Sequence, residues 1–99
     1  MTEHGPPTIT RHLRITGRVQ GVGYRWHMVQ QAQALGVRGW VRNRRDGSVE
    51  ALAIGAPTAV EQLIAWAQRG PEHGHVAGLA VTDAVCDEPL SGFEQRATE

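Results

Sequence analysis

The stretch from Gly17 to Arg25 is where this sequence could do chemistry. It reads Gly-Arg-Val-Gln-Gly-Val-Gly-Tyr-Arg and lies between a predicted strand and a predicted helix. Glycines let the backbone curl so that successive N–H groups converge, and a helix N-terminus adds free N–H groups and the positive end of its dipole. Arg25, in the first turn of that helix, would add a permanent charge and a planar fork of donors. The combination predicts an oxyanion site that needs no metal.

Two well-known phosphate-binding loops do not match this stretch. A Walker A loop needs Gly-Lys-Ser/Thr, and the chain contains no lysine. The dinucleotide-binding pattern would need a glycine at position 26, where Trp26 stands. From the residues alone, a glycine-rich turn with a surface arginine therefore stays open beside the oxyanion site.

The elements that must position this loop follow from two periodicities. Alternating apolar and polar residues predict half-buried strands, and apolar residues spaced by three and four predict helices with one buried face. We expect Gly36 to end the first helix, a capping box from Thr58 to Glu61 to begin the second, and Asp46-Gly47 to form a hairpin turn. The expected elements are a strand over 13–19, a helix from 24 or 25 to 35, strands over 38–44 and 48–54, a helix that ends at Gly70-Pro71, a loop over 72–78, a strand over 79–85 and a short edge strand within 90–96.

This order fits a split βαβ arrangement, in which two helices cover one face of an antiparallel sheet. Ninety-nine residues suffice for one domain and are too few for two. Residues 1–11 contain Gly5-Pro6-Pro7, which favours neither helix nor sheet, so we expect a flexible tail there. The sequence therefore predicts a domain of the α+β class that is preceded by a short tail.

Composition narrows the classes of function. No apolar run approaches the ~20 residues of a membrane span, and the N-terminus lacks the pattern of a secretory signal. The single Cys86 cannot form an intramolecular disulfide, so we expect a reduced, cytoplasmic setting. Residues 1–45 hold eight arginines and one acid, whereas residues 46–99 hold two arginines and nine acids. This asymmetry favours an anionic ligand, unless folding interleaves the two halves into an ordinary surface.

Two segments resemble the signatures of the acylphosphatase family. Residues 17–25 are similar to its motif Gly-Arg-Val-Gln-Gly-Val-x-Phe/Tyr-Arg. Residues 39–50 match its motif Gly-Trp-Val-Arg-Asn-x-x-Asp-Gly-x-Val-Glu at every defined position. The similarity spans about residues 12–96, which we therefore take as the domain, and it implies a ferredoxin-like sandwich of order βαββαβ.

The resemblance also implies roles for particular residues. Arg25 matches the arginine that binds the phosphate, and Asn43 matches the asparagine that positions the attacking water. In isolation, Asn43 would more often be a hairpin or edge residue. The backbone N–H groups implied in phosphate binding belong to Val19, Gln20, Gly21, Val22, Gly23, Tyr24 and Arg25.

The function implied is hydrolysis of acyl phosphates to a carboxylate and inorganic phosphate, without a metal or other cofactor. The two motifs contain no His, Asp or Glu suited to act as a base, so we expect a phosphate oxygen of the substrate to accept the water's proton. The expected partner is a small-molecule acyl phosphate, with no nucleic acid and no membrane, and we expect a monomer.

Two other functions stay open. An RNA-recognition domain has the same order of elements, but its third strand carries aromatic residues that stack on bases, and residues 48–54 contain none. The second is a domain that binds acyl or carbamoyl phosphate without turnover, since acylphosphatase-like modules occur inside larger proteins.

Other residues invite a chemical interpretation that we do not favour. Glu72-His73-Gly74-His75 could place three metal ligands close together, but we expect solvated loop residues. Trp26, Trp40 and Trp66 are expected to be core or groove residues rather than stacking platforms.

Overall fold

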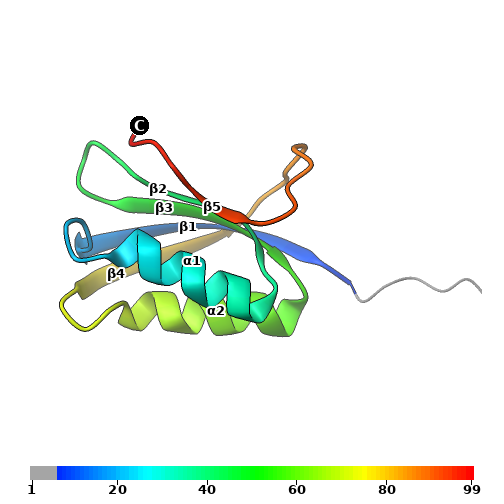
Figure 1. The fold of residues 1–99 in the computed structure, drawn as a ribbon, viewed down its shortest axis with the longest axis horizontal. Helices are drawn as coiled ribbons and strands as arrows, with labels where there is room; N and C mark the ends of the chain where they lie inside the picture. Colours follow the sequence, from blue (N-terminus) through cyan, green and yellow to red (C-terminus); the bar gives the residue numbers. More distant parts are fainter. Residues whose placement is uncertain (1–6) are drawn as a thin grey trace, which may run out of the picture.

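The structure is a computed structural model that describes residues 7–99. It has two layers, a five-stranded sheet and two helices against one face of that sheet (Figure 1). The strands lie in the order β4-β1-β3-β2-β5, which confirms the predicted α+β, ferredoxin-like sandwich. Neither helix is long and apolar enough to cross a membrane. The elements are β1 (Ile9–Arg18), α1 (Tyr24–Leu35), β2 (Arg38–Asn43), β3 (Val49–Gly55), α2 (Pro57–Arg69), β4 (His75–Asp83) and β5 (Phe93–Arg96).

The core lies between the sheet and the two helices. Alternate residues of β1, β2 and β3 point toward the helices, as their two-residue period predicts. The apolar stripes predicted for both helices face the same core, and the helices contact each other above it. The residues with no exposed surface are Leu13, Ile15, Met28, Ala32, Val41, Val49, Ala51, Ala53, Val60, Leu63 and Ala67.

The helix ends agree with the sequence in one case and differ in the other. Gly36 ends α1 in the left-handed conformation, with φ of 73°, as predicted. The predicted capping box is wrong, because α2 begins at Pro57 and no side chain caps it. Pro57 has a φ suited to the first helical position and no N–H to satisfy there. Thr58 then lies inside the first turn, where its hydroxyl cannot serve as the cap.

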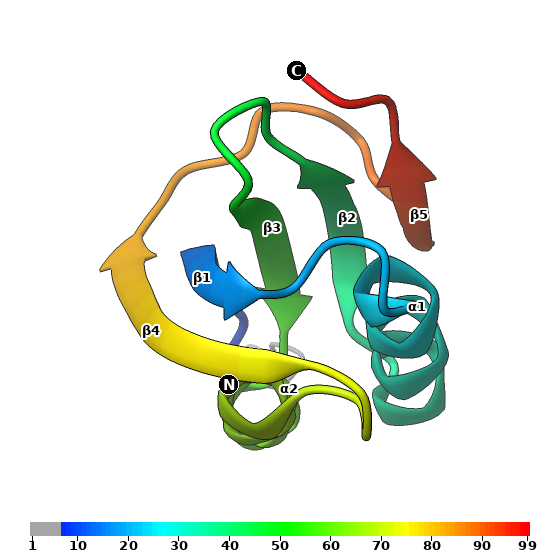
Figure 2. The same cartoon turned by 90° about the vertical axis from the view of Figure 1, so that its left-hand side faces the viewer.

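The sheet is mixed rather than wholly antiparallel as predicted, because β5 runs parallel to β2. After β4 the chain crosses the face of the sheet opposite the helices, at the end where β2 begins (Figures 1 and 2). A strand that follows this crossing must run in the direction of β2. The crossing segment covers a small second cluster of apolar side chains, namely Ala84, Cys86 and Leu90 on Trp40, Leu52 and Ile54.

Two strands begin earlier than the sequence predicts. β1 begins at Ile9, so residues 9–11, which we expected in the tail, belong to the sheet. Residues 1–6 of that tail lie outside the described residues. β4 begins at His75 rather than at 79, because residues predicted as a loop pair with the end of β1. That pairing includes a bulge between Thr16 and Gly17 and brings the two backbones so close that a Cβ on Gly17 would lie 2.2 Å from the carbonyl oxygen of His75.

Candidate active site

One pocket of about 130 Å³ joins the glycine-bearing loop to the end of β2. Its lining residues come from the loop, the start of α1, the end of β2 and β5. Figure 2 shows these elements from the side of the loop. Small-molecule pockets usually measure ~300–1,000 Å³, so this one suits a compact group such as a tetrahedral oxyanion. Arg25 and Asn43 both lie in it. The full lining is Val19, Gly21, Gly23, Tyr24, Arg25, Trp26, Asn43 and Gln95.

The backbone of the loop offers hydrogen-bond donors to this pocket. Within residues 7–99, the N–H groups of residues 20–26 have no partner, and the first intrahelical donor of α1 is His27, at 3.0 Å from the carbonyl oxygen of Gly23. Gly21 and Gly23 have φ values of 76° and 78°, which other residues rarely adopt. A left-handed residue beside the unpaired start of a helix makes an anion-binding concavity. We call residues 19–25 the cradle loop.

The seven N–H groups predicted to bind phosphate are not all alike in the structure. The N–H of Val19 is already used, because it donates to the carbonyl oxygen of Gly17 at 3.1 Å. Gln20 and Val22 do not line the pocket. Val22 packs against the core instead. Val19, Gly21, Gly23, Tyr24 and Arg25 line the pocket, and the N–H groups of Gln20 and Val22 have no partner within residues 7–99. Phosphate binding by the N–H groups of residues 19–25 therefore stays a prediction.

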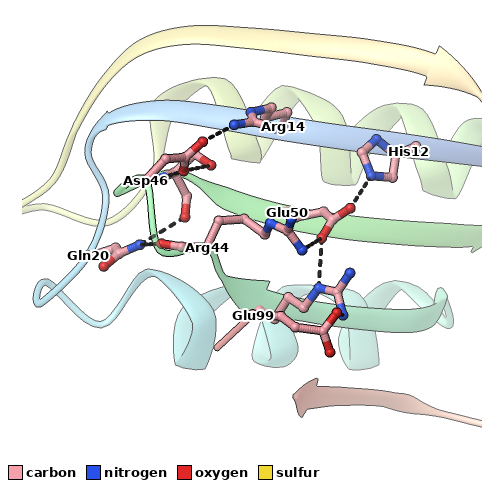
Figure 3. A network of polar contacts seen from close by, with 9 residues as sticks. His12, Arg14, Gln20, Arg44, Asp46, Glu50 and Glu99 are labelled. Carbon is pink, nitrogen blue, oxygen red and sulfur yellow. Dashed lines mark hydrogen bonds and ion pairs between the residues drawn. The ribbon is translucent and has the colours of Figure 1, made fainter. Parts of the chain in front are cut away.

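The side chain of Gln20 ties the cradle loop to the hairpin between β2 and β3 (Figure 3). Its Nε2 donates to the carbonyl oxygen of Arg44 at 2.8 Å and to that of Ser48 at 2.9 Å. Asn43 ends β2 directly before this hairpin. One side chain therefore fixes the distance between the loop that carries Arg25 and the strand that carries Asn43.

Arg25 brings an unpaired positive charge into the pocket. Within the described part of the chain its guanidinium has neither an ion-pair nor a hydrogen-bond partner, whereas Arg14, Arg42 and Arg96 each pair with a carboxylate. The planar guanidinium can donate two parallel hydrogen bonds to one oxyanion. An unpaired arginine that is half-buried beside free N–H groups is suited to bind a phosphate group.

Asn43 contributes a buried acceptor that lacks a partner. Its Oδ1 is inaccessible to solvent and accepts no hydrogen bond from the rest of residues 7–99. Leaving a buried polar atom unpaired costs about 1–3 kcal/mol, so this side chain is a candidate for a role other than stability. Its backbone carbonyl oxygen accepts from the N–H of Glu99 at 3.1 Å, which fixes the end of β2.

Two aromatic residues fix the start of α1. The hydroxyl of Tyr24 donates to the carbonyl oxygen of Ala67 at 2.7 Å, so the first residue of α1 is attached to α2. Burial raises the pKa of Tyr24, which keeps this hydroxyl a donor. His27 Nδ1 lies 2.8 Å from the carbonyl oxygen of Gly23, which can only accept, so Nδ1 carries a proton.

Behind the hairpin, a charged network holds β1, β2 and β3 together (Figure 3). Glu50 accepts from His12 Nε2 at 2.6 Å, from Arg42 Nε at 2.7 Å and from Arg44 at 3.3 Å. Burial alone would raise the pKa of Glu50, but the hydrogen bonds from His12 and Arg42 outweigh it and the pKa is lowered. Arginines of the basic half thus pair with acids of the other half, so the two blocks of charge interleave on the folded surface.

Trp26 and Gln95 line the site as well, although neither was predicted there. Trp26 is 56% exposed at the pocket and is therefore a groove residue, whereas Trp40 and Trp66 are buried; both positions fall within the expectation for the tryptophans. Gln95 is on β5, two residues after the buried Phe93. Gln95 is a polar residue on the same face of the edge strand as a buried side chain, and this was the signal in the sequence that could have indicated its place in the site.

The fold is that of a ferredoxin-like α+β protein, and its pocket lies at the N-terminus of the first helix and is lined by Arg25 and Asn43. The acylphosphatase family model matches residues 11–95, so the chain belongs to the acylphosphatase family. An acylphosphatase of Acidovorax sp. (strain JS42) is 58% identical over 92 residues, which cover 92% of this chain and 93% of that protein.

Solved structures agree with this assignment. The crystal structure of acylphosphatase from Bacillus subtilis aligns with a TM-score of 0.84 at 32% identity, over 89% of this chain and 98% of that one. Full-length HypF, in its phosphate- and nucleotide-bound form, aligns with a TM-score of 0.87 over 98% of this chain and 13% of its own. At 21% identity, that likeness concerns the fold alone.

Proposed function

We propose that this protein is an acylphosphatase that hydrolyses the carboxyl–phosphate bond of acyl phosphates. The observation that carries the proposal is that Arg25 and Asn43 line the same pocket as the cradle loop. Family membership and relatives named acylphosphatase over most of the chain support the same activity. The two alternatives, RNA binding and phosphate binding without turnover, lack such support. The sequence offers no stacking aromatics on β3, and the first two relatives match over 93% of their length.

In this proposal Arg25 and the free N–H groups of the cradle loop hold the phosphoryl oxygens. Phosphoryl transfer depends mainly on positioning and on stabilising charge. Donors that are fixed before the reaction stabilise charge that spreads over these oxygens in the transition state. The leaving group is a carboxylate, which is stable near neutral pH, so it needs little help from an acid.

Asn43 positions the attacking water. Its side-chain amide, which can both donate and accept hydrogen bonds, holds that water and directs the oxygen toward phosphorus. The new P–O bond forms as the bond to the carboxyl oxygen breaks, and the carboxylate leaves with that electron pair. Within the described residues, no carboxylate or imidazole lines the pocket. The water's proton therefore passes to a phosphate oxygen, which gives a carboxylate and inorganic phosphate without a cofactor. We propose that the protein does this as a cytoplasmic monomer acting on small molecules.

Hydrolysis of benzoyl phosphate, with and without a chelator, tests the proposal. Arg25→Ala should lower kcat/KM by about 10²–10⁴-fold, because two charge-assisted hydrogen bonds of ~1.5–3 kcal/mol each are lost. Arg69→Ala, which removes an exposed arginine at the end of α2, should leave the rate unchanged. Binding of inorganic phosphate without hydrolysis by the wild type would favour a binding domain without turnover, and sensitivity to the chelator would contradict the metal-free mechanism.

A further inference from the structure

Besides the cradle loop and Asn43, two more residues line the pocket. Trp26 follows Arg25 in the first turn of α1, and Gln95 comes from β5. We infer that Trp26 and Gln95 form the subsite for the acyl group, and that they make the enzyme select acyl phosphates with an aromatic or bulky apolar acyl group. This inference rests on the proposed function of the pocket.

The size of the pocket leads to this placement. A space of about 130 Å³ beside the free N–H groups holds a phosphoryl group, so the rest of the substrate must extend to the mouth. The lining residues with exposed side chains there are Trp26 and Gln95. The other exposed large apolar side chains of the described chain, Val81 and Val85, do not line the pocket.

The indole of Trp26 is held in place although it is exposed. The imidazole of His27 lies against it nearly edge-on, with ring centroids 5.1 Å apart and planes at 83°. His27 is itself fixed by its contact with the carbonyl oxygen of Gly23 at 2.8 Å. A side chain supported in this way loses little freedom on binding, so it can offer a flat apolar wall to the substrate.

Gln95 supplies a polar group to the same pocket. Gln95 pairs with Val41 of β2, close to the end of the strand where Asn43 lies. Its side-chain amide has no hydrogen-bond partner within residues 7–99. An amide N–H can donate to the carbonyl oxygen that every acyl phosphate carries. Negative charge grows on this oxygen as the carboxylate leaves, so the hydrogen bond becomes stronger in the transition state.

The two residues should therefore have separable effects. Trp26 contacts the variable part of the acyl group and sets selectivity between substrates. Gln95 contacts the carbonyl oxygen, which is common to all of them, and affects every substrate alike. Neither residue reaches inorganic phosphate, which occupies only the part of the pocket formed by the cradle loop and Arg25.

The experiment measures kcat/KM for benzoyl phosphate and acetyl phosphate, and the inhibition constant of inorganic phosphate, in four proteins. The wild type should prefer benzoyl phosphate. Trp26→Ala should reduce that preference about two- to tenfold, as expected for an aromatic contact. Gln95→Val should lower kcat/KM for both substrates by a similar factor of about 3–10. Val85→Ala, which shortens an exposed apolar side chain outside the pocket, should change nothing.

The inhibition constant separates this inference from the proposed function. In all four proteins it should stay within about twofold, since the cradle loop is unaltered. If the wild type hydrolyses both substrates and Trp26→Ala leaves their ratio unchanged, the acyl subsite is elsewhere. A Gln95→Val protein with wild-type rates would remove Gln95 from the subsite. If the wild type hydrolyses neither substrate, the proposed function itself fails, and the subsite fails with it.

Discussion

The side-chain amide of Gln20 donates to the carbonyl oxygen of Arg44 over 2.8 Å, and so links the loop of Arg25 to the strand of Asn43. The two proposed functional residues lie on different elements, and this bond is one of two that Gln20 makes across the gap between them. Positioning errors of about 1 Å can cost ~10²-fold in rate. Gln20 is thus a positioning residue that does not itself line the pocket.

Replacing Gln20 should test this link. Gln20→Ala removes two hydrogen bonds of about 0.5–1.5 kcal/mol each, and both carbonyl oxygens keep a backbone donor, so the loss of stability should be modest. We expect kcat for acyl phosphate hydrolysis to fall at least tenfold, because Arg25 and Asn43 lose their fixed separation. Urea unfolding and steady-state kinetics measure the two effects. Gln31→Ala, on the exposed side of α1, is the matched control, and an equal fall in kcat there would refute the positioning role.

Replacing Asn43 should lower the rate of the reaction much more than the stability of the fold. Because its Oδ1 is buried without a partner, Asn43→Ala should cost little stability, or even raise it, while kcat falls about 10²-fold. Chemical unfolding compared with turnover of benzoyl phosphate measures this contrast. In Asn43→Asp we expect low activity as well. A preserved rate with a new acidic limb in its pH profile would instead indicate that a protein base takes the proton.

Gly17 in β1 and Gly21 in the cradle loop should respond differently to a methyl group. Gly17→Ala places a Cβ 2.2 Å from the carbonyl oxygen of His75, so β4 must move, and we expect a loss of about 3 kcal/mol or more in the free energy of unfolding. A Cβ on Gly21 meets nothing within 4 Å, so Gly21→Ala should cost only about 1–2 kcal/mol of backbone strain. Urea denaturation of both variants gives the comparison, and equal losses would contradict the close approach of β1 and β4.

Glu50 should make stability depend on acid pH. Its pKa is lower in the folded chain than in the unfolded one, so its contribution is complete above the unfolded value near 4.5 and is lost as pH falls through the lower folded value. Glu50→Gln should therefore be less stable than the wild type at pH 7 and approach it at pH 3. Free energies of unfolding at several pH values measure this, with Glu61→Gln, on the exposed side of α2, as control. A gap that stays constant with pH would exclude the charged network as its cause.

Local sequence patterns predicted those features of the fold that depend on local contacts. The hairpin at Asp46-Gly47, the end of α1 at Gly36 and the buried stripes of both helices depend on residues close in sequence, and the structure has them. The start of α2 depended on two local signals in competition, and Pro57 prevailed over the capping box. The direction of β5 could not be predicted, because it results from where residues 84–92 cross the sheet.

The site also has one part that local sequence patterns predict and one part that they do not. Arg25 and Asn43 were predicted from two motifs, and the structure brings them into one pocket. Trp26 and Gln95 come from positions that only the folded chain brings together, and no single motif contains both. The start of β4 at His75 has a similar cause, since it depends on the bulge of β1 at Gly17.

Within residues 7–99, the N–H groups of residues 20–26 have no partner, so we expect the stability of the fold to depend on a bound anion. If these N–H groups find hydrogen-bond acceptors only when an anion is bound, the folded chain is less stable without the anion. Inorganic phosphate should therefore raise the melting temperature through binding to the folded state alone, by an amount set by its concentration relative to Kd. The product of the reaction would then protect the enzyme from heat at the same concentrations at which it inhibits turnover.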